Sequence, residues 1–512
     1  MYVANKEGQP QVGVILAENA VYPERGPFNP DTAYLEYPFP AALSEEKNIA
    51  YRAVRDLFIC LGYDAPNQGT PLWNPLGHIV KPGMKVVIKP NFVLSAHKFG
   101  KDLFSIITHP SVLRAVADYC WIALKGRGAI IIADAPQYNC NFGKLLEITG
   151  LGTLLTFYKG QSGPSFEILD LRGYWSAGRH FPSMCQPLPG DAKGGVMVNL
   201  GPLSALHGRE ARNYYGAVYH RRETIAHHSG DRQEYEIGGT ILQADVLISV
   251  PKMKVHKKVG VTLNVKGLVG MATSKNLLVH YALGTPSTGG DQFPDDFLKP
   301  HEAFLIWLER LFYDTFLARR SVPLEYVHRS MYAMHGLTTR KLGLTVGRHK
   351  GYPKRIFDAG NWHGNDTCWR MSADLAKVIY FADRQGNLQP RQQRPFLSVI
   401  DGIVGGEGQG PLEPDPKPSG LVVGGENLVA VDLVAARLMG FDPFALKMHR
   451  HLLTSKVFDF GVRGPEDIAV RSGDAAIRAC LTDKENRFSA YEPHPGWKGY
   501  IEVNPQPEER II

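Results

Sequence analysis

The sequence lacks paired cysteines, long apolar runs and the signature motifs of several common enzyme classes. Its six cysteines are scattered and form no C-x-x-C pair, which argues against a zinc site or an iron–sulfur cluster in this chain. No apolar run approaches the roughly 20 residues that span a bilayer, and the first residues lack the layout of a signal peptide. No G-x-S-x-G, H-E-x-x-H or kinase signature occurs, so hydrolase and kinase readings have no support. We therefore expect a reduced, cytoplasmic protein without a transmembrane segment.

The charge balance is close to even for a chain of this length. The 512 residues carry a net charge of +7 and are 44% hydrophobic and 21% charged, as in an ordinary globular protein. We therefore expect no nucleic-acid partner. The alternative is that nucleic acid binds through the basic segment Arg340–Arg355, which we interpret as a loop or lid. Binding of nucleic acid through it would depend strongly on salt.

Apolar runs and helical patterns alternate along much of the chain. Strands are predicted at residues 11–16, 84–89, 129–133, 246–250, 396–400 and 420–425, and helices at 45–62, 108–125 and 428–439. Thr108 is the expected N-cap of the second helix, with Pro110 in its first turn. Alternation of this kind predicts an α/β fold with a mostly parallel sheet flanked by helices. The length allows one large core or two lobes with a cleft between them.

Four segments follow from this pattern. Residues 1–80 are expected to pack a strand and helix on the core, 81–290 to form a first α/β lobe, 291–360 a helical and basic insertion, and 361–512 a second lobe. Residues 151–240 give no clear topology. The apolar helix predicted at 301–320 is expected to pack within the protein or in a homodimer, with a membrane-surface helix as the other option.

The most informative stretch runs from Asp245 to Asp291, which has six lysines and no acidic residue between its ends. A buried strand, 246–250, leads directly into this basic sequence. Ligands of open α/β sheets bind beyond the carboxyl ends of the strands, and cations gathered there indicate a phosphate or carboxylate ligand. A solvated lysine face is the alternative. The candidate substrate-binding residues at these strand ends are Lys89, Asn91, Lys252, Lys254, Thr262, Asn264 and Lys266.

Acid–base and metal chemistry have separate candidates. His256 stands between lysines that disfavour its charged form, which would leave it neutral and available as a base. Crowding could also lower the pKa of Lys254 and make it a base or nucleophile. Asp401 and Glu407, with Asp134, could hold Mg²⁺ against a bound phosphate, and Glu407 could instead act as an acid. Helix capping or ion pairs to lysines is the alternative for these carboxylates.

The segment Gly405–Gly410 is rich in glycine and follows a predicted strand. Its backbone N–H groups could approach a phosphate closely. Because Pro411 and Pro414 follow in place of a helix, neither the dinucleotide fingerprint nor the phosphate-loop motif is matched. A plain turn is the alternative. With strand ends at 424–425 and Asp432 in the next helix, five strand ends are expected on one edge of the sheet.

Several motifs occur together and in order. They are Lys89-Pro-Asn-Phe92, Thr108-His-Pro110, Asp134-Ala-Pro136, Pro251-Lys-Met-Lys-Val-His256, Gly260-Val-Thr-Leu-Asn-Val-Lys266, Asn361 through Arg370, Asp401 through Pro411, Val431-Asp432 and Gly440-Phe-Asp-Pro443. From about residue 80 to 445 the chain resembles the domain-of-unknown-function 362 proteins. Many of these carry ferredoxin-like modules with C-x-x-C-x-x-C runs. This chain resembles the longer, ferredoxin-free kind, which implies no cluster of its own and a loose association with polysaccharide or natural-product genes. A far weaker likeness to nickel-pincer lactate racemases aligns no ligand residue.

We therefore expect an enzyme acting on a small anionic molecule, with lysines binding the anion, His256 as base, and Asp401 with Glu407 binding a divalent metal or acting as acid. One alternative is a protein that binds an anionic metabolite or cofactor without converting it. Another, implied by the fused modules of the relatives, is a redox partner of a separate ferredoxin.

Overall fold

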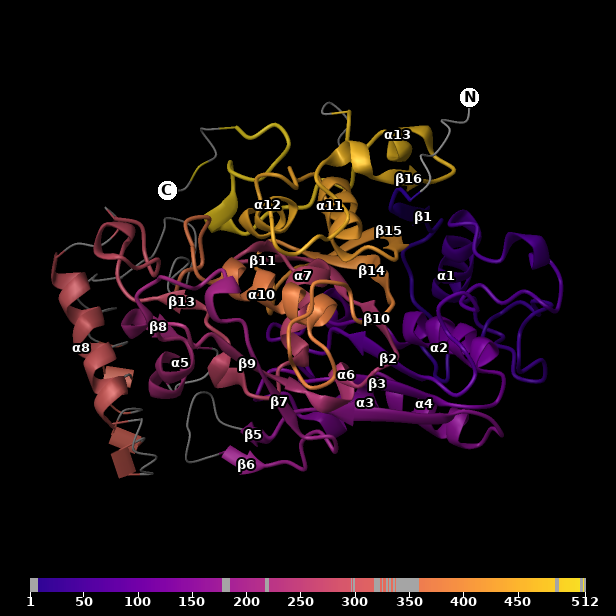
Figure 1. Ribbon diagram of the computed structural model, residues 1–512, viewed down its shortest axis with the longest axis horizontal. Helices are drawn as coiled ribbons and strands as arrows, with labels where there is room; N and C mark the ends of the chain where they lie inside the picture. Colours follow the sequence, from indigo (N-terminus) through magenta and orange to yellow (C-terminus); the bar gives the residue numbers. More distant parts are fainter. Residues whose placement is uncertain are drawn as a thin grey trace.

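A computed structural model describes residues 8–176, 185–216, 221–295, 300–316, 359–483 and 488–506, with isolated positions between 297 and 337 and residue 510. Its central feature is one ten-stranded sheet (Figure 1). Eight strands follow the order β16-β1-β15-β14-β10-β2-β3-β4; off this path, β11 pairs with β14 and β12 pairs with β11. In chain order these strands are β1 (Gln11–Leu16), β2 (Lys85–Pro90), β3 (Ala129–Asp134), β4 (Ser165–Asp170), β10 (Val246–Val250), β11 (Lys252–His256), β12 (Gly260–Val261), β14 (Phe396–Glu407), β15 (Asp415–Gly425) and β16 (Ala469–Arg471).

The sheet is mostly parallel. The neighbours β4, β3, β2, β10 and β14 all run in one direction. Only β15 in this path runs against its neighbours β14 and β1. This arrangement confirms the predicted α/β class. Because β1 from the amino-terminal segment pairs with β15 and β16 from the carboxyl-terminal segment, both ends of the chain contribute to the same sheet, and a division into two lobes is not shown.

Helices cover both faces of the sheet because neighbouring strand residues point to opposite sides. In β2, Val86 and Ile88 belong to one apolar core and Val87 to the other. The core of Val86 includes residues of α1 (Ile49–Cys60), α2 (Pro110–Leu124), α3 (Phe142–Ile148) and α4 (Leu151–Lys159). The other core includes residues of α6 (Gly239–Leu242), α7 (Leu263–Gly267), α10 (Cys368–Phe381), α11 (Leu428–Leu438), α12 (Lys447–Leu453) and α13 (Ala475–Arg478).

The glycine-rich segment after residue 400 continues as a strand to Glu407, and the turn given as the alternative is confined to residues 408–410. β14 continues from Phe396 to Glu407, pairing with β15 on one side and with β11 on the other. Its glycines serve close packing. A Cβ atom on Gly402 would lie 2.8 Å from the Leu421 carbonyl oxygen, and one on Gly406 would lie 2.5 Å from that of Ser105. The strand therefore needs glycine at these two positions because neighbouring backbone atoms leave no room for a side chain.

Two further local predictions are corrected. Because β15 is antiparallel to β14, its end at Gly425 lies beside Ser398 at the start of β14, so the fifth strand end is on the opposite edge of the sheet. The N-cap of α2 is His109, whose Nδ1 accepts the Ser111 N–H. The Thr108 hydroxyl instead donates to the Val250 carbonyl and accepts the Asn91 N–H, so it joins β10 to the residues after β2.

Smaller elements extend the side of the sheet that carries the carboxyl ends of its parallel strands. Two-stranded pairs form between β5 (Tyr174–Ser176) and β6 (Cys185–Pro187), β7 (Gly195–Asn199) and β9 (Glu234–Gly238), and β8 (Tyr214–Tyr215) and β13 (Tyr281–Ala282). They accompany α5 (Arg221–His227) and α8 (Pro300–Phe316).

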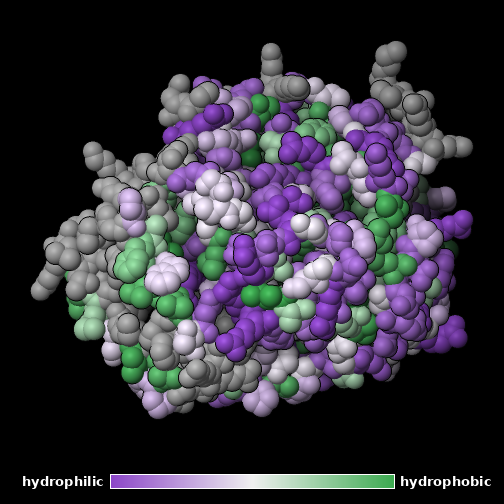
Figure 2. All heavy atoms as spheres, turned by 60° about the vertical axis from the view of Figure 1, so that its left-hand side comes forward, coloured by the Kyte–Doolittle hydropathy of each residue, from purple (hydrophilic) through white to green (hydrophobic). Residues whose placement is uncertain are grey.

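The helix predicted at 301–320 is present as α8, at the edge of the molecule (Figure 1). Phe304, Trp307, Leu308 and Leu311 on it are exposed. In Figure 2, which brings this side forward, hydrophobic residues gather on the left and hydrophilic ones cover the centre. In the described part of the chain, no helix combines the length and apolar character needed to cross a membrane. The segment Arg340–Arg355 lies outside the described residues.

Candidate functional site

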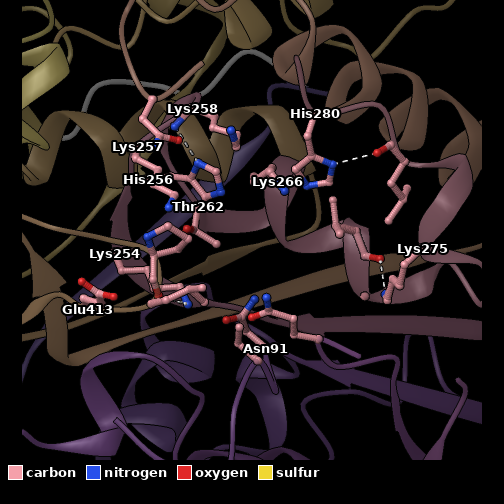
Figure 3. Close-up of a pocket in the computed structure, with 18 of the residues that line it drawn as sticks. Asn91, Lys254, His256, Lys257, Lys258, Thr262, Lys266, Lys275, His280 and Glu413 are labelled. Atoms are coloured by element: carbon pink, nitrogen blue, oxygen red, sulfur yellow. Dashed lines mark hydrogen bonds between the residues drawn. The ribbon is translucent and has the colours of Figure 1, made fainter. Parts of the chain in front are cut away.

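A cavity of about 630 Å³ opens at the carboxyl ends of β2, β3 and β11. Of the residues predicted from the sequence, six line it: Asn91, Asp134, Lys254, His256, Thr262 and Lys266. They come from segments far apart in the chain, and Figure 3 shows the side chains of Asn91, Lys254, His256, Thr262 and Lys266 around one space. Several other lining residues were not among the candidate site residues predicted from the sequence; they include Gln137, Tyr215, Lys275, His280, Tyr281, Arg310, Asn361 and His494.

β11 supplies the first cations. It follows β10 after Pro251, and its alternate residues Lys252, Lys254 and His256 share one face of the strand. All three are buried. The Lys254 ammonium donates to the backbone carbonyls of Ile106 (2.6 Å) and Pro411 (3.3 Å). Burial, with the charges of Lys252 and Lys266, holds the pKa of Lys254 well below its ordinary value.

Lys266 comes from α7, the short helix after β12. The Asp432 carboxylate fixes the start of this helix by accepting the backbone N–H groups of Asn264 and Val265, both at 2.8 Å. Leu263 has a φ of +44° there, a costly conformation for a branched residue. Lys266 is buried, and its ammonium makes no hydrogen bond to any described residue. Burial lowers its pKa.

Lys275 is the third buried lysine of the cavity. Its ammonium donates to the Ala135 carbonyl (2.7 Å) and the Val269 carbonyl (3.2 Å). Burial lowers the pKa of Lys275 to about 7, against the attraction of Asp134. Lys254, Lys266 and Lys275 thus meet in one cavity, and among the described residues no carboxylate forms an ion pair with any of them.

Three histidines also line the cavity. The Nδ1 atoms of His256 and His494 accept the N–H groups of Lys258 and Gly496, each at 3.1 Å. The Nδ1 atom of His280 lies 2.7 Å from the Leu278 carbonyl oxygen. Burial, followed by the charge of nearby lysines, lowers the pKa of all three, and that of His494 to about 3. The rings are therefore neutral near pH 7.

Four buried oxygen atoms at the cavity have no hydrogen-bond partner among the described residues. They are Asn91 Oδ1, Gln137 Oε1, Thr262 Oγ1 and Asn361 Oδ1. Buried polar atoms in native proteins are nearly always hydrogen-bonded. These four oxygen atoms can accept hydrogen bonds from donor groups of a ligand.

The remaining predicted site residues do not line the cavity. They are Lys89, Lys252, Asn264, Asp401 and Glu407. The Asn264 side chain donates to Ser398 and Asp432. The buried Asp401 carboxylate accepts hydrogen bonds from the Lys252 ammonium (3.0 Å), the Tyr22 hydroxyl and the His109 N–H. These residues therefore hold strands and loops together behind the site.

The carboxylates proposed as magnesium ligands are engaged by lysines. Asp134 pairs with Lys89 at 3.0 Å, Asp401 with Lys252, and Glu407 with Lys417 at 3.2 Å. In the described ranges, no group of three His, Cys, Asp or Glu side chains is arranged to hold a metal ion. Ion pairs with lysines, which were the alternative expected from the sequence, are what the structure shows for all three carboxylates.

The residues that sequence reasoning missed had weak signals. Lys275 and His280 lie in the acid-free stretch that directed attention to Lys254, but neither follows a predicted strand. Tyr215 lies in the stretch 151–240, which gave no clear topology, and Arg310 lies on the helix predicted at 301–320, whose apolar character did not indicate a ligand site. Tyr215 stacks on Tyr281 with ring centroids 5.2 Å apart, and this contact depends on chain segments that meet only in the folded protein.

Comparison with known proteins identifies the family but no activity. Residues 190–437, which include Lys254, Lys266, Lys275 and two of the three histidines, match the family model described as Domain of unknown function (DUF362). No curated protein matches the chain. The likeness to nickel-pincer lactate racemases has no support from these matches. The predicted resemblance to the DUF362 family is therefore confirmed over residues 190–437.

Proposed function

We propose that the cavity binds a small anionic molecule carrying a phosphate or carboxylate, and that the protein is an enzyme acting on it. The observation that carries this proposal is the meeting of Lys254, Lys266 and Lys275 without a paired carboxylate. A buried cation is unfavourable unless it is paired. An anion in the cavity would supply the missing partner to all three.

The size and lining of the cavity support a small ligand. Its volume of about 630 Å³ falls within the range of roughly 300 to 1,000 Å³ that is usual for small-molecule sites. Apolar residues such as Phe92, Val93 and Leu278 lie among the cations, so part of the ligand can be uncharged. The unpartnered oxygens of Asn91, Gln137, Thr262 and Asn361 favour a ligand with hydroxyl or other donor groups.

The neutral histidines favour an enzyme over a protein that only binds its ligand. Anion binding needs cations, whereas a neutral ring offers both an N–H donor and a lone pair through which a proton can be transferred. A purely binding protein would use the lysines and would lose nothing when the histidines are replaced. We therefore give the binding role as the alternative.

Binding is tested first, with anions of simple shape. Sulfate, pyrophosphate and citrate are titrated into the full chain by calorimetry at constant ionic strength, with chloride as the blank. We expect at least one multivalent anion to bind. The Lys266→Met variant should bind it roughly 10- to 100-fold more weakly, since a hydrogen bond to a charged group contributes about 1.5–3 kcal/mol.

The control is Lys144→Met, which removes the same charge from an exposed position on α3. Its affinity should equal that of the wild type. Equal weakening in both variants would mean that the anion responds only to net charge. No binding by any of the anions, or full affinity in Lys266→Met, would contradict the proposed site.

A further inference from the structure

The three histidines of the cavity differ in which ring nitrogen carries the proton. Their backbone partners decide this, because an N–H group can only donate and a carbonyl oxygen can only accept. His256 and His494 accept N–H groups at Nδ1, so in the neutral ring the proton is on Nε2. His280 faces the Leu278 carbonyl with Nδ1, so its proton is on Nδ1 and its Nε2 keeps a lone pair.

The free nitrogens of His256 and His280 are turned to the same space. No described residue makes a hydrogen bond with Nε2 of either ring. Figure 3 shows Lys266 between the two rings, and the second nitrogen of His280 on the side of Lys266. The positive charges of Lys258 and Lys266 act on both rings, and that of Lys275 on His280. The cavity thus presents the Nε2 lone pair of His280 as a proton acceptor, and beside it the Nε2–H of His256 and the ammonium of Lys266 as donors.

We infer that His280 takes a proton from the bound anionic substrate, with His256 and Lys266 stabilising the charge that this step creates. The substrate would be a phosphate or carboxylate compound that also presents an acidic O–H or C–H group to the cavity. That bond breaks, its proton goes to Nε2 of His280, and its electron pair stays on the substrate. The Nε2–H of His256 and the ammonium of Lys266 then donate to the more negative product.

This inference rests on the proposed anion site and changes one role within it. The sequence favours His256 as the base, because it follows a strand within the lysine cluster. In the structure, the Nδ1 lone pair of His256 already accepts the Lys258 N–H, and its other nitrogen carries the proton. His256 is therefore suited to donate, and the lone pair available to a substrate belongs to His280.

Affinity alkylation of the wild-type chain tests this assignment. Bromoacetate carries a carboxylate for the lysines and a carbon that a ring lone pair can attack, with loss of bromide. At pH 7.5, peptide mapping by mass spectrometry should show carboxymethylation of His280 about tenfold or more faster than of His256, whose Nε2 has no lone pair in this tautomer. Sulfate should slow the reaction. Faster modification of His256, or none of His280, would overturn the inference.

Two further measurements separate this inference from the anion site on which it rests. Bromoacetamide has the same bromide leaving group without the negative charge. If it modifies His280 as fast as bromoacetate does and sulfate gives no protection, the anion site is overturned while the lone pair is upheld. Long-range ¹H–¹⁵N spectra of ¹⁵N-histidine protein without ligand report the tautomers directly, with His280→Asn and His256→Asn for assignment. A proton on Nε2 of His280 would overturn the role of this ring.

Discussion

Lys275 is expected to couple anion binding to the uptake of a proton. Its pKa falls from 10.5 to about 7 because burial penalises the charged form. This fall corresponds to about 5 kcal/mol against the ammonium, since each pKa step is about 1.4 kcal/mol. At pH 8 only about a tenth of Lys275 would be charged. A bound anion favours the charged form, so binding at pH 8 should take up close to one proton at this residue, and binding at pH 6 almost none.

The sign of the pH dependence follows from the same values. Below pH 7 the ammonium of Lys275 is already present and the affinity should be constant with respect to this group. Above pH 7 anion binding must also drive the protonation of Lys275, so the affinity should fall by up to about tenfold per pH unit. Lys254 and Lys266 have lowered pKa values as well, and they add to the proton uptake of the wild type.

Calorimetry in buffers of different ionisation enthalpy measures this uptake. Sulfate is the probe because it does not titrate in this pH range. The Lys275→Met variant should take up about 0.9 proton fewer than the wild type at pH 8, and Lys275→Arg, which stays charged, should show the same loss of uptake. An enthalpy that does not depend on the buffer at pH 8, with sulfate bound, would refute the reasoning.

Three further predictions concern stability. Lys266→Met should raise stability by roughly 1–4 kcal/mol in thermal unfolding. Because the folded pKa of Lys266 is lowered, this gain is full below that pKa and disappears as the pH rises to 10.5; a gain that grows with pH would contradict it. Asp401→Ala should cost about 3–5 kcal/mol in urea unfolding, since it leaves the Lys252 ammonium buried without its partner, and adding Lys252→Met should recover part of this loss; equal costs for the single and double variants would contradict it. Gly270→Ala should cost about 1–3 kcal/mol, because its Cβ would lie 1.7 Å from a carboxylate oxygen of Asp134, which pairs with Lys89. Gly173→Ala, with open space around it, should leave stability nearly unchanged. Equal melting temperatures for the two variants would argue against the close approach at Gly270.

Some of the site could be predicted because it is local in the chain. The strand at 246–250 and the lysines that follow it are adjacent in sequence, and an apolar run that ends in cations indicates both the strand and its ligand-binding end. Lys254, His256 and Lys266 were found in this way, and Asn91 and Asp134 by the same rule at β2 and β3.

Other predicted residues failed to join the cavity because charge alone does not identify a ligand site. Asp401 and Glu407 follow an apolar run as Asn91 does, yet β14 continues through Asp401 as far as Glu407, and each carboxylate meets a lysine. Whether a carboxylate faces a cavity or an ammonium depends on partners far away in sequence. Asp401 and Lys252 are 149 residues apart.

The sequence by itself determined the α/β class, six strands of the sheet, the helices α1, α2, α8 and α11, and the cationic character of the site, because all of these arise from patterns between near neighbours. Only the tertiary structure decided the direction of β15, the pairing of the carboxylates and the entry of Lys275 and His280 into the cavity. It also decided which histidine keeps a lone pair on Nε2, since residue type alone does not set the tautomer of a neutral ring. The difference between them is a backbone N–H in one case and a backbone carbonyl in the other, and the path of the folded chain sets that choice.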